Sequence, residues 1–189
     1  MAESVGARGR DDGLTVERLV SVTVELLDEV GIEAFSMRSL ALRLGRSQMA
    51  AYRHVGGRDE LLLLAALEVE SILPDLGDGP WYERLEAVMR HSWETTWSAH
   101  PWIVELMHRG DFPLAESGRL ELMQDLDRAG GFEGERLEDA LVAHWSFVVG
   151  TLTVILAMRA TGTPGDARVF DFNLGLYIAG IRAVAAEHR

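Results

Sequence analysis

The stretch SMRSLALRLGRSQMAAYRHVGGR, residues 36–58, decides the fold of the N-terminal part of this chain. Two short segments with helical apolar spacing, 37–44 and 47–54, meet at the turn Gly45-Arg46-Ser47. Glycine suits the end of a helix, and serine suits the N-cap of the next one. Two short helices of this length, separated by a glycine end and a serine cap, are typical of a helix-turn-helix, whose second helix enters the major groove of DNA.

The second segment separates into a packing face and an outward face. We expect it to pack through Ala51 and Val55, while the side chains expected to point outward are Gln48, Met49, Ala50 and Tyr52. A glutamine amide can pair with adenine and an arginine with guanine, which suits this segment to reading bases. The same spacing also fits an ordinary helical hairpin with a solvated arginine face, so the residues alone leave both interpretations open.

The distribution of charge along the sequence supports DNA binding, although the net charge does not. The net charge is −12, which opposes binding to phosphate, and every basic residue is an arginine. Residues 36–58 nevertheless hold five arginines and no acidic residue. The sequence therefore places one basic island in an acidic protein.

The rest of the chain is a series of helices separated by glycine and proline. One helix is predicted from Thr15 to Gly31, and the others are predicted over 58–72, 81–99, 101–109, 114–129, 135–160 and 168–188. The chain contains no cysteine, which excludes disulfides, thiolate zinc sites and cysteine nucleophiles. We predict an all-α fold with a disordered arm over 1–14, a helix-turn-helix domain over 15–62 and a larger helical domain over 73–189. The 58–72 helix would join the two domains.

Residues 14–62, LTVERLVSVTVELLDEVGIEAFSMRSLALRLGRSQMAAYRHVGGRDELL, resemble the N-terminal DNA-binding domain of TetR-family transcriptional repressors. Tyr52, His54 and Val55 match the family's Tyr-x-His-Val/Phe signature. The segments Trp81-x-x-Arg84-Leu85, His100-Pro101-Trp102 and 170–176 are similar to the tetracycline-repressor branch. The resemblance implies a homodimer that binds a palindromic operator and is released by a small-molecule inducer.

The resemblance also implies roles for single residues. Arg38 stands where tetracycline repressors contact guanine, and Gln48 where they contact adenine, while Tyr52, His54 and Arg58 stand at backbone-contacting positions. The complete predicted DNA-binding set is Arg38, Ser47, Gln48, Met49, Ala50, Tyr52, His54 and Arg58. Met49 and Ala50 replace the proline and threonine of the tetracycline repressor, so we expect a different operator.

The C-terminal part carries the aromatic residues that suit a ligand cavity. All five tryptophans lie there: Trp81, Trp93, Trp97, Trp102 and Trp145. Aromatic and methionine side chains with few polar groups suit a partly apolar inducer, although the same spacing is also typical of an ordinary core. The predicted pocket residues are Met89, Trp93, Trp97, Met107, Met123, His144 and Val148.

The segment 140–158 carries no formal charge and is long enough to span a membrane. Contact with lipid would be unfavourable for the polar side chains of His144, Ser146, Thr151 and Thr153, and no second span is expected. We therefore predict a helix buried on all sides within a bundle.

This helix and the small residues on 168–188 are predicted to form a dimer interface. Its residues would be Val149, Thr153, Gly175, Ala179 and Ala183. Residues 1–14 lack an apolar core, so we expect a cytoplasmic location and no membrane partner.

Two other classes of function remain open at this point. Glu105-x-x-His108 and the reversed His91-x-x-Glu94 are reminiscent of di-iron bundles, but only one correctly oriented copy is present. A helical carboxylate enzyme is therefore one alternative, and a helical adaptor that binds a protein partner without reading DNA is the other. We expect no catalytic residue, metal or cofactor.

Overall fold

The computed structural model describes residues 13–110 and 118–187. In these ranges the chain forms helices and no strand, as the sequence predicts. The chain divides into two compact units, 1–65 and 66–189, which are described separately. The predicted disordered arm lies outside the described residues up to residue 12, and Leu14 is buried.

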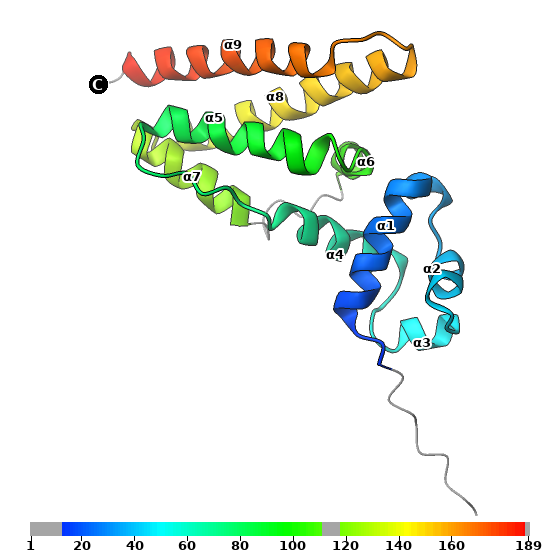
Figure 1. The fold of residues 1–189 in the computed structure, drawn as a ribbon. Helices are drawn as coiled ribbons and strands as arrows, with labels where there is room; N and C mark the ends of the chain where they lie inside the picture. The colour runs from blue at the N-terminus through cyan, green and yellow to red at the C-terminus, as the bar shows by residue number, and fades with distance from the viewer. Residues whose placement is uncertain (1–12, 111–117, 188–189) are drawn as a thin grey trace, which may run out of the picture. The chain divides into compact units, whose positions relative to one another are not determined.

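The N-terminal unit is built from α1 (Val16–Ala34), α2 (Met37–Leu44), α3 (Gln48–Tyr52) and the first part of α4 (Arg58–Glu70) (Figure 1). Side-chain oxygens cap the first three helices: Thr15 accepts from Arg18 N at 3.2 Å, Ser36 from Ser39 N at 3.1 Å, and Ser47 from Ala50 N at 3.2 Å. These serines and threonines satisfy amide groups that a helix start leaves free.

Glycines set the two bends of this unit. Gly45 ends α2 in the left-handed region at φ 63°, where a side chain would be strained. Gly31 has φ 74° and ψ 174°, which are not helical angles, so the regular helix that begins at Val16 is interrupted at the predicted residue. A further turn follows this kink and extends α1 to Ala34, and the Phe35 N–H donates to Gly31 O at 3.2 Å.

The C-terminal unit holds α5 (Trp81–Ser92), the π-helical turn η1 (Trp93–Trp97), α6 (Trp102–Arg109), α7 (Gly118–Gly130), α8 (Glu135–Ala160) and α9 (Asp166–Ala186) (Figure 1). α8 packs along α9, and α5 packs against α7 and α9. The single helix predicted over 81–99 changes to π geometry at Trp93. The start of the helix predicted over 114–129 lies outside the described residues.

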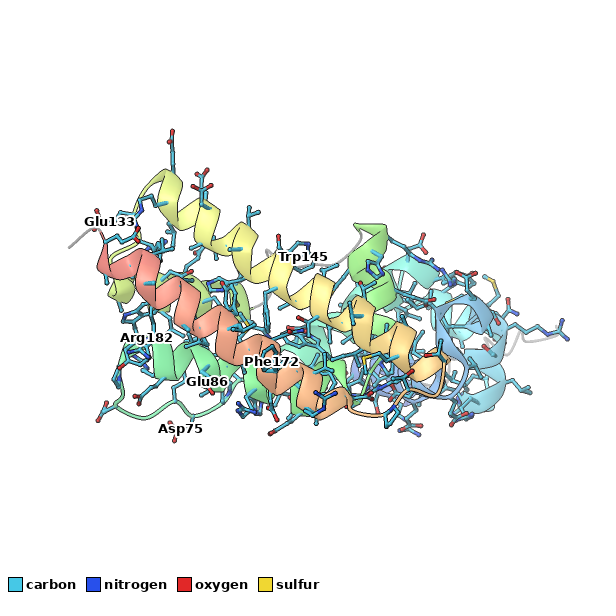
Figure 2. The ribbon with its side chains drawn as sticks, turned by 90° about the horizontal axis from the view of Figure 1, so that it is seen from above. Asp75, Glu86, Glu133, Trp145, Phe172 and Arg182 are labelled. Carbon is cyan, nitrogen blue, oxygen red and sulfur yellow. The ribbon has the colours of Figure 1, made fainter. Side chains whose placement is uncertain are left out.

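α8 and α9 each have a buried stripe and a second stripe with large apolar side chains that are exposed in the described part of the chain. On α9, Leu174, Ile178 and Ile181 are buried, while Phe172 is 66% exposed and Leu176 60% exposed. Figure 2 views these two helices with Phe172 labelled on α9. The prediction that the 140–158 helix is buried on all sides is wrong for the single chain, since only 28% of its apolar window is buried.

The expectation of a single membrane-length segment is also wrong. Both α8 and α9 are long and apolar enough to cross a membrane by length and composition, and 28% of the apolar window of each is buried. This is weak evidence for a membrane, because core helices of water-soluble proteins meet the same criterion. A helix that is apolar on two sides indicates two packing partners as readily as lipid.

Candidate nucleic-acid interface and ligand cavity

Helix α3 presents three side chains on one exposed face. Gln48 is exposed, Met49 is 71% exposed and Tyr52 is 45% exposed. Ala50 was predicted to point outward with them, but it is 4% exposed, so its predicted DNA contact is not supported. At 3.6 residues per turn, Ala50 lies nearly opposite Gln48, on the side where Ala51 packs into the unit.

The other predicted DNA-binding residues surround this face. Arg38 is exposed on α2, and His54, just after α3, is half-buried. Ser47 is exposed, but its hydroxyl already accepts the Ala50 N–H, so it acts first as the cap that fixes the start of α3. The structure thus brings Arg38, Gln48 and Tyr52 to the surface of the helix-turn-helix.

Arg43 and Arg58 of the basic island are engaged inside the N-terminal unit. Arg43 forms a bidentate ion pair with Glu29, with N···O distances of 2.9 and 2.5 Å. The hydrogen bonds from Arg43 hold the pKa of the Glu29 carboxyl below its ordinary value. This pair reduces the positive potential that the sequence attributes to residues 36–58.

Arg58 is the second engaged arginine, and its partners lie at the end of α1. Its Nη2 donates to Ile32 O at 2.6 Å, its Nε donates to Phe35 O at 3.3 Å, and the guanidinium lies 6.0 Å from the Phe35 ring centroid. The guanidinium therefore satisfies carbonyls that the end of α1 leaves free. This geometry gives the side chain a structural role that the resemblance does not imply, and the phosphate contact stays a prediction.

We expect Arg58→Ala to lower the free energy of unfolding of the N-terminal unit by about 1–3 kcal/mol, because two carbonyls lose a charged donor. The salt dependence of DNA binding should change little, since the guanidinium does not face solvent freely. Thermal unfolding of the full chain and DNA affinity against salt measure the two effects. Arg43→Ala is the matched control, and its exposed ion pair should matter much less for stability. A flattened salt slope at unchanged stability would show that Arg58 contacts phosphate instead.

The predicted pocket residues gather around one cavity of about 50 Å³ in the C-terminal unit. Six of the seven line it: Met89, Trp97, Met107, Met123, His144 and Val148. Trp93 does not line this cavity. It stacks on Phe170 with a centroid distance of 4.7 Å, under the guanidinium of Arg159. The π-helical turn that begins at Trp93 interrupts the i, i+4 spacing from which its place in the pocket was predicted.

A buried ion pair in the cavity wall was not predicted from the sequence. Arg119 Nε donates to Glu70 Oε2 at 2.5 Å, and the two side chains are 3% and 2% exposed. Arg119 also donates from Nη2 to Glu70 O at 3.2 Å and to Ile72 O at 3.3 Å, and from Nη1 to the Ser92 hydroxyl. The sequence does contain a signal for this pair. Glu70 lies four residues after Ala66 on the buried apolar stripe of α4, and an acidic side chain at such a position needs a buried partner.

Burial raises the pKa of the Glu70 carboxyl, against the opposing effect of Arg119. The guanidinium both pairs with this carboxylate and satisfies carbonyls at the end of α4. A positive charge at a helix C-terminus is favourable to the helix dipole. Arg119 therefore fixes the end of α4 to α7 and to the cavity wall.

His144 is held in a buried chain of hydrogen bonds. Its Nε2 lies 2.8 Å from Asp127 Oδ2, and its Nδ1 lies 2.5 Å from the Tyr177 hydroxyl. Burial raises the pKa of Tyr177, and the charge of Asp127 adds to this effect. A hydroxyl that keeps its proton donates to Nδ1, which leaves the Nε2–H to donate to Asp127. Both ring nitrogens are thus in use, and His144 offers the cavity its ring surface only.

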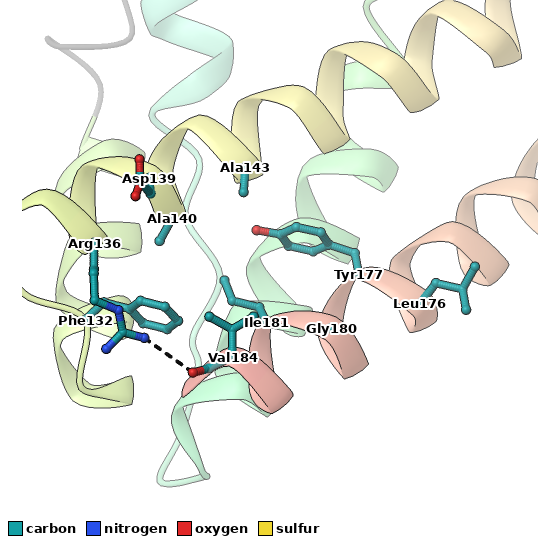
Figure 3. A pocket seen from close by; sticks show the side chains of 10 residues that line it. All are labelled: Phe132, Arg136, Asp139, Ala140, Ala143, Leu176, Tyr177, Gly180, Ile181 and Val184. Carbon is teal, nitrogen blue, oxygen red and sulfur yellow. Dashed lines mark hydrogen bonds between the residues drawn. The ribbon is translucent and has the colours of Figure 1, made fainter. Parts of the chain in front are cut away.

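A larger hollow of about 570 Å³ lies between α8 and α9, lined among others by Arg136, Ala143, Tyr177 and Val184. Figure 3 shows Tyr177 between the two helices, and the Arg136 guanidinium donating to Val184 O at 3.3 Å. Leu176, 60% exposed, also lines it. This hollow opens on the exposed apolar stripe of α9, so it belongs to the surface of the unit and is separate from the cavity beside Glu70.

The predicted dimer residues lie on α8 and α9. Thr153, Gly175, Ala179 and Ala183 are exposed, and Val149 is half-buried. The Thr153 hydroxyl also lies 2.9 Å from His108 Nε2. Larger apolar side chains are also exposed on these two helices and were not among the predicted residues: Val142, Val154, Phe172, Leu176 and Val184. On α9, Phe172 and Leu176 are spaced i, i+4, which is the sequence signal for a second apolar face.

The residues considered for a di-iron centre do not form one. Among residues 13–110 and 118–187, no group of three or more histidine or acidic side chains could hold a metal ion. Glu105 and His108 are both exposed on α6, and His108 bonds to Thr153.

Known proteins give the family of the chain. Residues 19–65 match the family described as bacterial regulatory proteins, tetR family. The chain is 35% identical over 149 residues to the HTH-type transcriptional repressor DrrR1 of Streptomyces coeruleorubidus, covering 76% of this chain but only 54% of that protein. It is 32% identical over 180 residues to an HTH-type transcriptional regulator of Saccharopolyspora erythraea, covering 93% of this chain and 69% of that protein.

A solved structure extends the similarity over both units. The ActR protein of Streptomyces coelicolor, in its apo form, has a TM-score of 0.75 and 25% identity, covering 93% of this chain and 98% of ActR. ActR has also been solved in complex with actinorhodin. With the exposed helix-turn-helix and the relative from Saccharopolyspora, this similarity assigns the chain: it belongs to the TetR family of bacterial transcriptional regulators.

Proposed function

We propose that the chain is a ligand-responsive transcriptional repressor that binds a palindromic operator as a homodimer. The observation that carries this proposal is the exposed face of α3, where Gln48, Met49 and Tyr52 point away from the unit. A capped helix presented in this way after a left-handed glycine turn suits insertion into the major groove. The curated relative DrrR1 is named as a repressor, which supports the direction of control.

Base contacts are assigned to the side chains that can pair with base edges. Gln48 would pair with adenine and Arg38 with guanine, while Tyr52 and His54 would contact phosphates and fix the register. Two recognition helices in a dimer would enter successive major grooves, roughly 34–36 Å apart. The acidic remainder of the chain would weaken non-specific binding, since like charge repels the DNA backbone.

The exposed apolar stripes of α8 and α9 supply the dimer contact. Val142, Phe172 and Leu176 are between 60% and 66% exposed, which is unusual for large apolar side chains in water. Two copies related by a two-fold axis would cover these stripes in a four-helix interface. Ser146 and Thr153 lie exposed among them and suit a protein partner better than lipid. We accordingly place the protein in the cytoplasm, where operator DNA is available.

The inducer would occupy the cavity beside Glu70. Its position supports a link to DNA binding, because Glu70 is the last residue of α4, and α4 begins at Arg58 in the N-terminal unit. A ligand that binds preferentially to a geometry of α4 that does not fit the operator would lower the affinity of the protein for DNA. The coupling free energy between ligand binding and DNA binding would be about 1–3 kcal/mol. ActR, which shares the fold, binds actinorhodin, and this supports a small-molecule ligand of partly apolar character.

The test of the proposal is Gln48→Ala. We expect it to lose discrimination at one base pair in each half-site, at a cost of about 1–3 kcal/mol per half-site. Affinities for an operator and for its single-base variants, measured at fixed salt, give the result. Gln124→Ala removes the other glutamine of the chain, on α7, and should leave operator preference unchanged. An unaltered preference in Gln48→Ala would remove α3 from base recognition.

A further inference from the structure

The polar groups around the cavity beside Glu70 are nearly all in use. His144 has both nitrogens bonded to Asp127 and Tyr177. The Ser92 hydroxyl donates to Val88 O at 2.7 Å and accepts from Arg119. None of these groups can recognise a ligand without breaking a bond that the unit already makes.

Two polar atoms of the cavity wall have no hydrogen-bond partner among the described residues. They are Glu70 Oε1, an acceptor, and Trp97 Nε1, a donor. Glu70 is 2% exposed and Trp97 is 5% exposed, so water in the bulk does not satisfy them. The indole N–H lies near enough to the carboxylate to favour its ionised form, although it makes no direct hydrogen bond with Oε1. A buried donor and a buried acceptor therefore lie close to each other, and neither atom makes a well-formed hydrogen bond.

Burying such atoms without a hydrogen bond costs free energy when the cavity is empty, and a ligand that bonds to them removes that cost. Each unsatisfied buried polar group loses its hydration without compensation. A ligand group that donates to the carboxylate oxygen and accepts from the indole would satisfy both at once. A hydroxyl is the smallest organic group with both capacities.

We propose that the ligand is an uncharged, mainly aromatic molecule whose hydroxyl group bridges Glu70 Oε1 and Trp97 Nε1. This inference rests on the proposed function and names the chemical class of the inducer. A charged ligand is disfavoured, because Glu70 and Arg119 neutralise each other: a carboxylate would face Glu70, and an ammonium would face Arg119.

The walls fit the apolar part of this molecule. Met89, Met107 and Met123 line the cavity, and methionine adapts its shape and makes favourable contacts with aromatic rings. The volume of about 50 Å³ is smaller than an aromatic ring requires, since a cavity that binds benzene has about 150 Å³. Binding therefore requires the methionines to move, and the hydroxyl then contacts the last residue of α4.

The test compares four probes that share a naphthalene ring: 2-naphthol, 2-methylnaphthalene, 2-naphthoate and 2-methoxynaphthalene. Calorimetric titration of the full-length protein should give a dissociation constant for 2-naphthol about 10- to 100-fold lower than for 2-methylnaphthalene, with 2-naphthoate the weakest. 2-Methoxynaphthalene accepts a hydrogen bond but donates none, so it should not match 2-naphthol.

Two variants separate the two halves of the bridge. Trp97→Phe removes the donor and should abolish most of the preference for 2-naphthol. Glu70→Gln keeps an oxygen for Arg119 and turns an amide N–H₂ toward the cavity, so 2-methoxynaphthalene should then bind about as tightly as 2-naphthol. Trp93→Phe is the matched control, since Trp93 stacks on Phe170 away from the cavity. Thermal unfolding of each variant confirms that it is folded.

Equal affinity of 2-naphthol and 2-methylnaphthalene, or a preference that Trp97→Phe leaves intact, would overturn the inference. So would the failure of every probe to bind. The affinity of the same samples for operator DNA without a probe tests the proposed function separately, so the two can fail independently.

Discussion

Arg119→Met is expected to lower the free energy of unfolding of the C-terminal unit by about 3–5 kcal/mol, among the largest effects of any single change in this chain. The substitution leaves the Glu70 carboxylate buried without its cation and frees the carbonyls of Glu70 and Ile72 at the end of α4. Urea unfolding followed by tryptophan fluorescence measures the loss, since all five tryptophans lie in this unit.

A double variant tests whether the ion pair itself is responsible. Replacing both partners, in Glu70→Leu with Arg119→Met, removes the buried charge and should recover most of the lost stability. Arg128→Met is the matched control on α7, because Arg128 pairs with Asp125 at the surface and should cost less than about 1 kcal/mol. A loss in Arg119→Met no greater than in Arg128→Met would contradict the buried pair.

The second large effect is expected from Phe172→Glu combined with Leu176→Glu. In a two-fold interface each new carboxylate approaches those of the partner copy, so the proposed dimer should dissociate. A single chain can engage one half-site only, and operator affinity should fall about 10²- to 10⁴-fold through loss of the second contact. Stability of the single chain should change little, because both side chains are already exposed.

Sedimentation and operator titration measure the two consequences. Ala167→Glu adds a carboxylate to an exposed position of α9 outside the Phe172–Leu176 stripe, and it should leave the dimer and its affinity unchanged. If the double variant sediments and binds DNA as the unaltered protein does, the dimer contact lies elsewhere.

Local signals predicted the N-terminal unit well, because its helices begin and end at residues that determine local geometry. Ser36 and Ser47 cap α2 and α3, and Gly45 terminates α2 in the left-handed region. Partners of long side chains were less predictable. Arg58 binds carbonyls of Ile32 and Phe35, more than twenty residues earlier in the chain, and helical periodicity contains no such information.

The cavity shows the same limit. Helical spacing located most of its apolar wall, but Trp93 stacks on Phe170 and does not line the cavity. The π-helical turn Trp93–Trp97 also means that the α-helical spacing that grouped Trp93 with Trp97 does not apply. The place of Glu70 on the apolar stripe of α4 indicates that it needs a buried partner, but Arg119 lies on a helix far away in the sequence, so only tertiary structure identifies that partner. The second apolar stripe of α9 was underestimated for a related reason. When a helix is apolar on two sides, its sequence does not show which side packs within the same chain and which side stays exposed.

The most direct test of the central claim is selection of binding sites from a pool of random double-stranded DNA with the full-length protein. We predict enrichment of an inverted repeat whose half-sites are centred about 10–10.5 base pairs, or a small multiple of that, apart, bound by two chains per duplex. Recovery of no preferred sequence, or of an unrepeated site bound by one chain, would contradict a dimeric operator-binding repressor.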